Sequence, residues 1–454
     1  MVKSRGARAA VKERPVTASA SPDGPLVLVQ ENHDLPLVRL CLVLRGGMAE
    51  DPPGLEGLAQ FASELARRGA AGMGREELDA RFDALGADLG VSVTHDAVTY
   101  DLQVLSRHLE EALGLLAEVI LRPDFRPEEA EHLMRETEAG LDELMEDDPS
   151  LARRFFFREL FGAHPYGKPA LGTRSSIARF SAAASRDWME RMVSGGNLIV
   201  GVSGAVDARA VTELILRRFR ALRPGALPHV ALPMPAPARG LRALLVDKPE
   251  RTQSQILIGQ PVPAWSDPDF IPLSVATNAF GGTFTARLMT EVRAKRGLSY
   301  GASARLGQGR GPRSLLVYVF PSIERTGETL ELVLELWRDW VENGLHDEEL
   351  AFARENLASS FTCDLVTCDD RLDLFLSMAL CGLPPDYMET TAARIRAVTP
   401  EQVRATMKRH LRARDLTVTV LSTAGALRDQ LQGRKGLRSL FGRGDLPTYA
   451  YDSF

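Results

Sequence analysis

Long apolar stretches are missing from this sequence, and so is the apolar core of a secretion signal. No uninterrupted apolar run approaches the ~18 residues that a membrane-spanning helix needs. Residues 1–24 carry basic side chains without a following apolar segment, so they do not resemble a signal peptide. We therefore expect a cytoplasmic protein without a membrane partner, or a periplasmic protein if a leader has been removed.

Cysteine is also scarce, with four residues in a chain of 454. Cys363 and Cys368 lie five positions apart, which is neither a zinc-knuckle nor a redox spacing. We expect these two, together with Cys41 and Cys381, to be free thiols in apolar surroundings, as suits a reducing compartment. A chain of this length buries a full core without a disulfide or a structural metal.

Charge of one sign is not in excess, because 55 basic and 60 acidic residues leave a formal net charge of −5. This balance argues against a nucleic-acid or anionic-membrane surface. The 44% hydrophobic and 25% charged residues are typical of a soluble globular chain. At roughly 100–200 residues per domain, the length predicts two to four domains.

Proline is concentrated in the segment PGALPHVALPMPAPARG at 224–240, which contains five prolines. Such a segment is neither a helix nor a central strand, and it predicts an extended linker. On each side of it, two apolar, β-branched runs precede a loop and a helix pattern. These runs are Leu26–Gln30 and Leu37–Arg45 before the linker, and Leu241–Val246 and Gln253–Ile258 after it.

This repeat at domain scale predicts an α+β fold with two homologous α/β sandwich halves. Each half has an antiparallel-rich sheet with helices packed on it, and one half covers the other like a clam. The turn residues Asn32–Asp34 predict that the first two runs form a hairpin. The expected parts are a flexible arm at 1–24, a first domain at 25–223, the linker at 224–240, a second domain at 241–425 and a tail at 426–454.

The helix pattern of the first half lies in GLEGLAQFASELARRG, at 54–69, with Leu58, Phe61, Ala62 and Leu65 at helical spacing. This segment resembles the first motif of the pitrilysin/insulinase family of zinc peptidases, which includes the mitochondrial processing peptidases. In that family the motif is H-x-x-E-H. The resemblance implies two histidines that bind zinc from one helix face, a glutamate that acts as general base, and a second glutamate from a later helix.

The residues that this chemistry needs are absent at the matching positions. Aligned on Gly57 and Phe61, the chain has Gln60 and Glu64 in place of the two histidines and Ser63 in place of the base. The distal carboxylate falls at Leu141, and a register shifted by one residue offers Gly140 or Asp142. Glutamine is a poor zinc ligand, serine is no carboxylate base, and leucine has no lone pair. We therefore expect no metal and no other cofactor in this chain.

Four further segments extend the resemblance over roughly Leu26 to Ser422. They are FGAHPYGKPALGT at 161–173, NLIVGVSGAVD at 197–207, NAFGGTFTARLMTEVRAKRGLSYGASA at 278–304 and HDEELAFARENLASSF at 346–361. The third matches the most recognisable C-terminal motif of the family. A chance similarity of one amphipathic helix does not explain a resemblance of this length.

The third segment keeps the residues that complete the active site in catalytic relatives, an arginine and a tyrosine seven positions apart. Here they are Arg293 and Tyr300 in EVRAKRGLSY. A guanidinium and a phenol donate hydrogen bonds to a peptide carbonyl as it becomes negative. Lys295 and Arg296 are neighbouring cations that do not match the motif.

The same segment contains G-x-S-x-G, formed by Gly297, Ser299 and Gly301. As a nucleophile elbow this motif needs a strand before the serine and a helix after it. The pattern here is the reverse, with a helix at 286–295 and an extended segment at 299–305. We therefore do not expect a serine hydrolase.

The resemblance implies a non-zinc-binding subunit of a heteromeric zinc peptidase. Its Arg293 and Tyr300 would act in trans on the site of a paralogous H-x-x-E-H subunit, which holds the zinc and cleaves extended peptides or unfolded segments. The alternative is an inert structural or peptide-binding homologue, and this alternative includes a homodimer. The glycine-rich loop of a processing-peptidase recognition subunit is reduced here to Gly281-Gly282.

Overall fold

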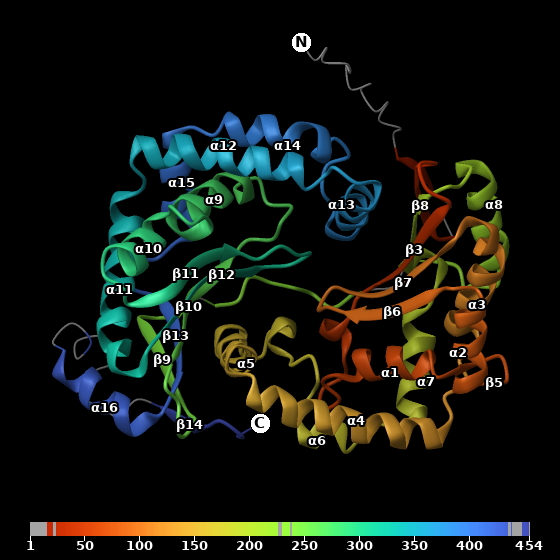
Figure 1. Ribbon diagram of the computed structural model, residues 1–454, viewed down its shortest axis with the longest axis horizontal. Helices are drawn as coiled ribbons and strands as arrows, with labels where there is room; N and C mark the ends of the chain where they lie inside the picture. Colours follow the sequence, from red (N-terminus) through yellow and green to blue (C-terminus); the bar gives the residue numbers. More distant parts are fainter. Residues whose placement is uncertain are drawn as a thin grey trace, which may run out of the picture.

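The chain forms two six-stranded sheets, each faced by helices, on opposite sides of the molecule (Figure 1). The computed structural model describes residues 16–20, 24–225, 229–236, 238–434, 437 and 447–453. Within these residues the architecture is the α+β fold of two similar halves that the repeat predicts. The first half lies on the right of Figure 1 and the second half on the left.

The two sheets share the order of five strands, and each has a sixth strand at the same edge. The first contains, in spatial order, β1 (Thr17–Ser19), β2 (Leu26–Glu31), β8 (Leu198–Gly204), β3 (Leu37–Arg45), β7 (Ala97–Leu105) and β6 (Asp88–Val93). The second contains β14 (Thr448–Ala450), β9 (Leu241–Asp247), β13 (Leu416–Ser422), β10 (Gln255–Val262), β12 (Arg313–Pro321) and β11 (Ser299–Leu306). Five strands of the second sheet therefore have counterparts in the first, which explains the repeat in the sequence. The edge strands differ, because β1 pairs antiparallel with β2 whereas β14 pairs parallel with β9.

The predicted hairpin of β2 and β3 is wrong, because β8 lies between these strands. It runs parallel to β2 and antiparallel to β3. In the second half, β13 separates β9 from β10 in the same way. Every residue of β8 and of β13 is buried, so the backbone of each strand needs hydrogen-bonding partners on both edges. This requirement places each of them inside its sheet.

Helices cover both sheets. The first half contains α1 (Leu58–Ala66), α2 (Arg75–Ala84), α3 (Leu109–Leu121), α4 (Pro127–Glu146), α5 (Asp148–Phe161), α6 (Arg174–Ile177), α7 (Ala182–Met192) and α8 (Ala208–Arg218). The second contains α9 (Phe270–Thr277), α10 (Arg287–Met289), α11 (Thr326–Asn343), α12 (Asp347–Cys363), α13 (Cys368–Cys381), α14 (Tyr387–Arg396), α15 (Pro400–His410) and α16 (Ala424–Gly433). Two π-helical turns, Asn278–Gly282 and Thr290–Ala294, flank α10.

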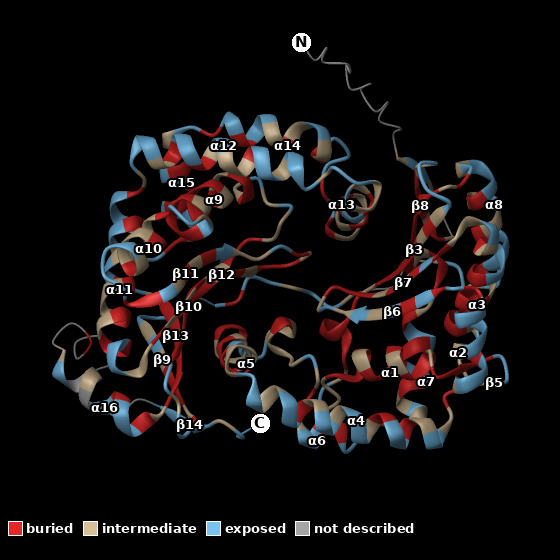
Figure 2. Ribbon diagram, viewed as in Figure 1, coloured by how far each residue is buried: buried red, intermediate tan, exposed pale blue. Residues whose placement is uncertain are grey.

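Strand alternation divides the core of each sheet into two layers. In β3, Leu40 and Leu42 pack against the helices of the first half, whereas Cys41 and Val43 face the opposite way. Both faces of the strand are buried, as Figure 2 shows for the central strands of both sheets. Each sheet therefore needs a second cover on the face that its own helices leave open.

That second cover comes from the other half of the chain. Helix α5 of the first half packs on β10 and β13, where Phe156 lies in one cluster with Leu257. Helix α13 of the second half packs on β2 and β8, where Leu376 lies in one cluster with Cys41 and Val43. In Figure 1, α5 lies next to the second sheet and α13 next to the first. The two halves thus exchange one helix each.

The turn between β11 and β12 is anchored in the first half. The hydroxyl of Tyr166 donates a hydrogen bond to the carboxylate of Asp96 and accepts one of 2.8 Å from the backbone N–H of Gly311. Arg313 forms an ion pair of 2.5 Å with Asp96, and its guanidinium carbon lies 4.2 Å from the centre of the Tyr166 ring. The His-Pro-Tyr-Gly segment of the sequence therefore joins the two halves.

The ends of the chain take part in the sheets. Residues 1–15 and 21–23 of the expected arm lie outside the described residues, but 17–19 form β1, which pairs with β2 because this edge of the sheet is otherwise open. In the expected tail, 448–450 form β14 on the free edge of β9. The linker residues 229–236 form neither helix nor strand.

The sequence predicts free cysteines and no membrane-spanning helix. All four cysteines are free, with Cys41 and Cys381 buried as expected, whereas Cys363 is exposed and Cys368 partly so. None of the helices in the described ranges is both long and apolar enough to cross a membrane.

Candidate functional site

Helix α1 carries the positions that match the zinc motif. It begins after Gly57, whose φ of 94° lies in the left-handed region that favours glycine. The carboxylate of Asp51 accepts hydrogen bonds of 2.8 Å from the backbone N–H groups of Gly57 and Ala59. The four apolar residues of α1 that the helical spacing selects are all buried against the core: Leu58, Phe61, Ala62 and Leu65. The start and the orientation of this helix are therefore fixed.

The polar side chains of α1 do not form a metal-binding set. The Nε2 of Gln60 lies 3.5 Å from Oε1 of Glu64 one turn later, and Glu64 also pairs with Arg67 at 3.6 Å. Burial raises the pKa of Glu64, against the opposing effect of Arg67. Ser63 is completely buried, and its hydroxyl donates a 2.7 Å hydrogen bond to the carbonyl of Ala59. Ser63 therefore cannot replace a carboxylate base.

The position of the distal ligand lies on α4, which packs against α1. Leu141 has no exposed surface and belongs to the apolar core. Asp142, offered by the shifted register, is exposed and pairs with Arg174 at 2.5 Å. Gly140 has no side chain. Because Leu141 lies in the core and the Asp142 carboxylate is paired with Arg174, these positions do not supply the distal ligand of a zinc site.

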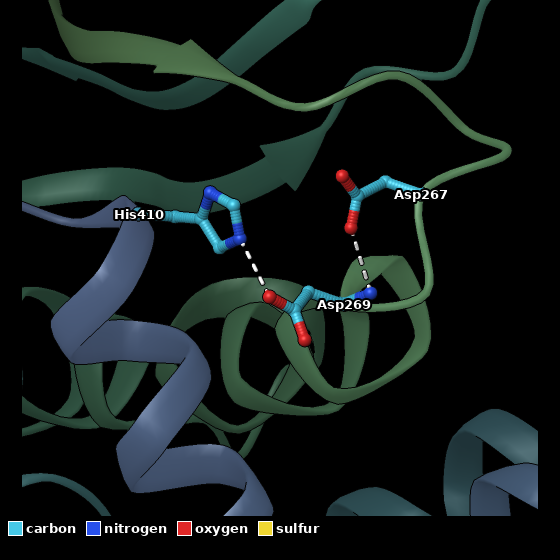
Figure 3. Close-up of side chains that lie close together, drawn as sticks. All are labelled: Asp267, Asp269 and His410. Carbon is cyan, nitrogen blue, oxygen red and sulfur yellow. Dashed lines mark hydrogen bonds and ion pairs between the residues drawn. The ribbon is translucent and has the colours of Figure 1, made fainter.

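One group of potential metal ligands occurs elsewhere in the described part of the chain, formed by Asp267, Asp269 and His410 (Figure 3). The Nε2 of His410 lies 2.8 Å from Asp269, which also forms an ion pair with Arg409. Burial favours a higher pKa for Asp269, but the hydrogen bonds from His410 and Arg409 outweigh it and lower that pKa. Asp267 accepts a 2.8 Å hydrogen bond from the backbone of Asp269. We interpret the group as an ion-pair cluster that joins α9 to α15.

Arg293 and Tyr300 lie close together at the surface of the second half. Arg293 is in the π-helical turn after α10, and Tyr300 is the second residue of the edge strand β11. The guanidinium carbon lies over the Tyr300 ring, 4.4 Å from its centre, and over the ring of Phe284, 4.5 Å from its centre. Tyr300 is 76% exposed and Phe284 70% exposed. Such exposure of two large aromatic rings at one place is typical of a binding surface.

The neighbouring cations are neutralised, whereas Arg293 is not. Lys295 and Arg296 both pair with Glu291, at 2.6 and 2.5 Å. Their hydrogen bonds lower the pKa of the Glu291 carboxylate. Within the described residues, the side chain of Arg293 forms no hydrogen bond and no ion pair, so the N–H groups of its guanidinium remain available. The geometry therefore separates Arg293 from the two alternatives that the sequence offers.

Backbone irregularity surrounds this pair. The π-helical turns at 278–282 and 290–294 enclose the loop that carries Phe284, and such turns are frequent at functional sites. A Cβ at Gly281 would lie 2.5 Å from the backbone nitrogen of Ala304, so glycine allows the first turn to approach β11. The sequence does not single out Phe284 as a site residue. Its place in the loop after Gly281-Gly282 is the one sequence feature that points to it.

The G-x-S-x-G pattern is not a nucleophile elbow. Ser299 is buried at the start of β11, and its hydroxyl donates a 2.8 Å hydrogen bond to the carbonyl of Gly301. A strand follows the serine where the elbow requires a helix, as expected.

The fold and the Arg–Tyr pair define a two-half, peptidase-like scaffold, and comparison with family profiles agrees. Residues 26–174 match the profile described as insulinase (peptidase family M16). Residues 179–357 match the profile described as the peptidase M16 inactive domain. The chain belongs to peptidase family M16.

Curated relatives cover most of the chain at low identity. An uncharacterized zinc protease of Streptomyces coelicolor is 25% identical over 398 residues, which are 86% of this chain and 84% of that protein. The non-peptidase homolog YmxG of Helicobacter pylori is 22% identical over 397 residues, 87% of this chain and 91% of that protein. One of these relatives is thus named a zinc protease and the other a non-peptidase homolog.

Solved structures share the fold. A peptidase M16 inactive domain from Pseudomonas fluorescens has a TM-score of 0.83 and 25% identity, over 90% of this chain and 98% of that chain. The first half of the periplasmic protease PqqL from Escherichia coli has a TM-score of 0.77 and 14% identity, over 98% and 100%. Against the whole PqqL protease, the likeness covers 97% of this chain and 52% of that chain.

Proposed function

We propose that this chain is the non-zinc-binding subunit of a heteromeric zinc peptidase. In this proposal a paralogous subunit with an intact H-x-x-E-H motif holds the zinc, and this chain supplies Arg293 and Tyr300 in trans. The observation that carries the proposal is the unpaired guanidinium of Arg293 against the exposed ring of Tyr300. In the same chain, the residues at the zinc-motif positions do not form a zinc site, whereas both donors of the Arg293–Tyr300 pair are present.

The pair suits the stabilisation of negative charge. When bound in the partner, zinc would supply the Lewis acid and the activated water. The guanidinium of Arg293 and the hydroxyl of Tyr300 would donate hydrogen bonds to the carbonyl oxygen of the peptide as its charge develops. Preorganised donors of this kind stabilise the transition state more than the substrate.

An extended peptide has a place beside the pair. β11 is an edge strand of the second sheet, and β6 is the corresponding edge strand of the first. A peptide can add to such an edge through main-chain hydrogen bonds. Tyr300 lies near the start of β11, so a peptide on this edge would pass next to the hydroxyl. Unfolded segments and short peptides fit this mode of binding.

Reconstitution with a zinc-motif paralogue tests the proposal, with dye-labelled casein as the unfolded substrate. We expect Arg293→Ala and Tyr300→Phe each to lower kcat by about 10²–10³-fold, the usual effect of removing one such donor. Arg296→Ala is the matched control, because Arg296 already pairs with Glu291. Size-exclusion chromatography would establish that every variant still forms the complex. Equal activity of the wild type, Arg293→Ala and Tyr300→Phe would contradict the proposal.

The second candidate is a peptide-binding homologue without a catalytic role, including a homodimer. Its supporting observation is the same exposed aromatic surface, because Phe284 and Tyr300 offer stacking area to any peptide. The name of the Helicobacter pylori relative agrees with it. Casein binding by the isolated chain, lost in Tyr300→Ala, together with unchanged turnover by the zinc-motif paralogue, would favour this function.

A further inference from the structure

Core packing does not explain the position of the Phe284 ring. It is 70% exposed on the loop between the first π-helical turn and α10, so its ring contributes little to the core. A phenylalanine exposed to this degree leaves most of its apolar surface in water. Its defined contact is with the guanidinium of Arg293, whose carbon lies over the ring at 4.5 Å from its centre.

The two rings restrict how Arg293 can bind. Its guanidinium carbon lies over Phe284 and over Tyr300 at nearly equal distances, 4.5 and 4.4 Å. A guanidinium whose carbon lies over aromatic rings keeps the N–H groups at its edges for a ligand. Edge N–H groups donate in the plane of the guanidinium, as a pair. Acceptors that fit them are a carboxylate, which can take both N–H groups, or a carbonyl oxygen of an extended peptide.

We propose that Phe284 is a positioning residue for Arg293. Its ring holds the guanidinium against Tyr300, so that the two donors face a bound peptide together. This role rests on the proposed function, because positioning matters only if Arg293 contacts the peptide. Without the ring, a long and mobile side chain would sample several orientations before each binding event.

Nuclear magnetic resonance on the isolated chain tests the contact without any partner. The side-chain Nε–Hε signal of Arg293 is identified by its loss in Arg293→Lys. We expect this signal to be displaced by ring currents in the wild type and in Phe284→Tyr, and to move towards the free-arginine position in Phe284→Leu. An unchanged signal in Phe284→Leu would overturn the proposal. Because Phe284 is exposed, the thermal midpoint of each variant should match the wild type.

Activity of the reconstituted complex on dye-labelled casein tests the role. A cation–π contact at an exposed site corresponds to about a 2- to 5-fold effect on kcat/KM, which Phe284→Leu should lose and Phe284→Tyr should keep. In an Arg293→Ala background, Phe284→Leu should have no further effect. An effect of Arg293→Ala without one of Phe284→Leu overturns the positioning role alone. If Arg293→Ala itself has no effect, the proposed function fails, and the positioning role with it.

Discussion

Among single residues, His95 has a pKa well below that of a free histidine. It lies at the junction of the two halves, where its ring packs 5.2 Å from that of Tyr166. Its Nε2 lies 3.1 Å from the carbonyl of Lys168, so Nε2 carries the proton that donates this bond. Burial, together with the charge of Arg313, lowers the pKa of His95 to about 4. The imidazole is therefore neutral over the range in which a free histidine becomes charged.

This lowered pKa predicts a loss of stability in mild acid. Below about pH 6.5 the unfolded chain binds a proton at His95, whereas the folded chain binds it only near pH 4. The free energy of unfolding should fall across this window by up to about 3 kcal/mol. Urea unfolding at about pH 7.5, 5.5 and 4.5 would measure it. His95→Gln keeps a donor for Lys168 but does not titrate, so a pH dependence equal to that of the wild type would contradict this prediction.

The sequence predicts candidate site residues but not how their side chains pair. The register of the α1 motif predicts which chemistry is missing at Gln60, Ser63 and Glu64, because helical spacing fixes their relative places. The family motif selects Arg293 over Lys295 and Arg296, but the sequence does not show which of the three cations is paired. Which of them pairs with Glu291 depends on side-chain directions that only the folded backbone sets. The role of Phe284 depends likewise on a loop conformation.

At the scale of elements, the exchanged helix α5 holds the halves together. Phe156 is completely buried between α5 and the second sheet. We expect Phe156→Ala to lower the free energy of unfolding by about 3–5 kcal/mol, because it removes a large buried ring and leaves a cavity. Phe352→Ala on α12 is the control, since Phe352 is 51% exposed, and its effect should stay within about 0.5 kcal/mol. Chemical unfolding of both variants measures the difference. Similar effects of the two would show that α5 is not an essential cover.

Helices were easier to predict than strand partners. The periodic apolar residues of α1 predict this helix near its observed bounds, because a helix bonds within its own segment. Strands bond to partners that are remote in sequence. The turn at 32–34 predicts a hairpin, but β8, more than 150 residues later, supplies the partner of both β2 and β3. Local turn chemistry carries no information about such a late insertion.

At the scale of the whole molecule, the exchange of α5 and α13 predicts that neither half is stable alone. A fragment of residues 16–225 has a sheet without α13 and a bare α5, and a fragment of residues 229–453 has the converse defect. Each should bind a hydrophobic dye and lack a cooperative thermal transition, and co-expression should restore one folded complex. Cooperative unfolding of either fragment as a dye-free monomer would contradict this expectation.

The exchanged helices also bear on inheritance. The two halves share the order of five strands, as a duplicated unit would, yet each completes the fold of the other. A recombination event in the proline-rich segment would bring α5 into a new chain without the sheet that it covers. Crossovers between paralogues at this point would therefore be selected against, although the segment joins the two sheets in the sequence. Genes of this architecture are expected to be inherited and exchanged as complete two-half units.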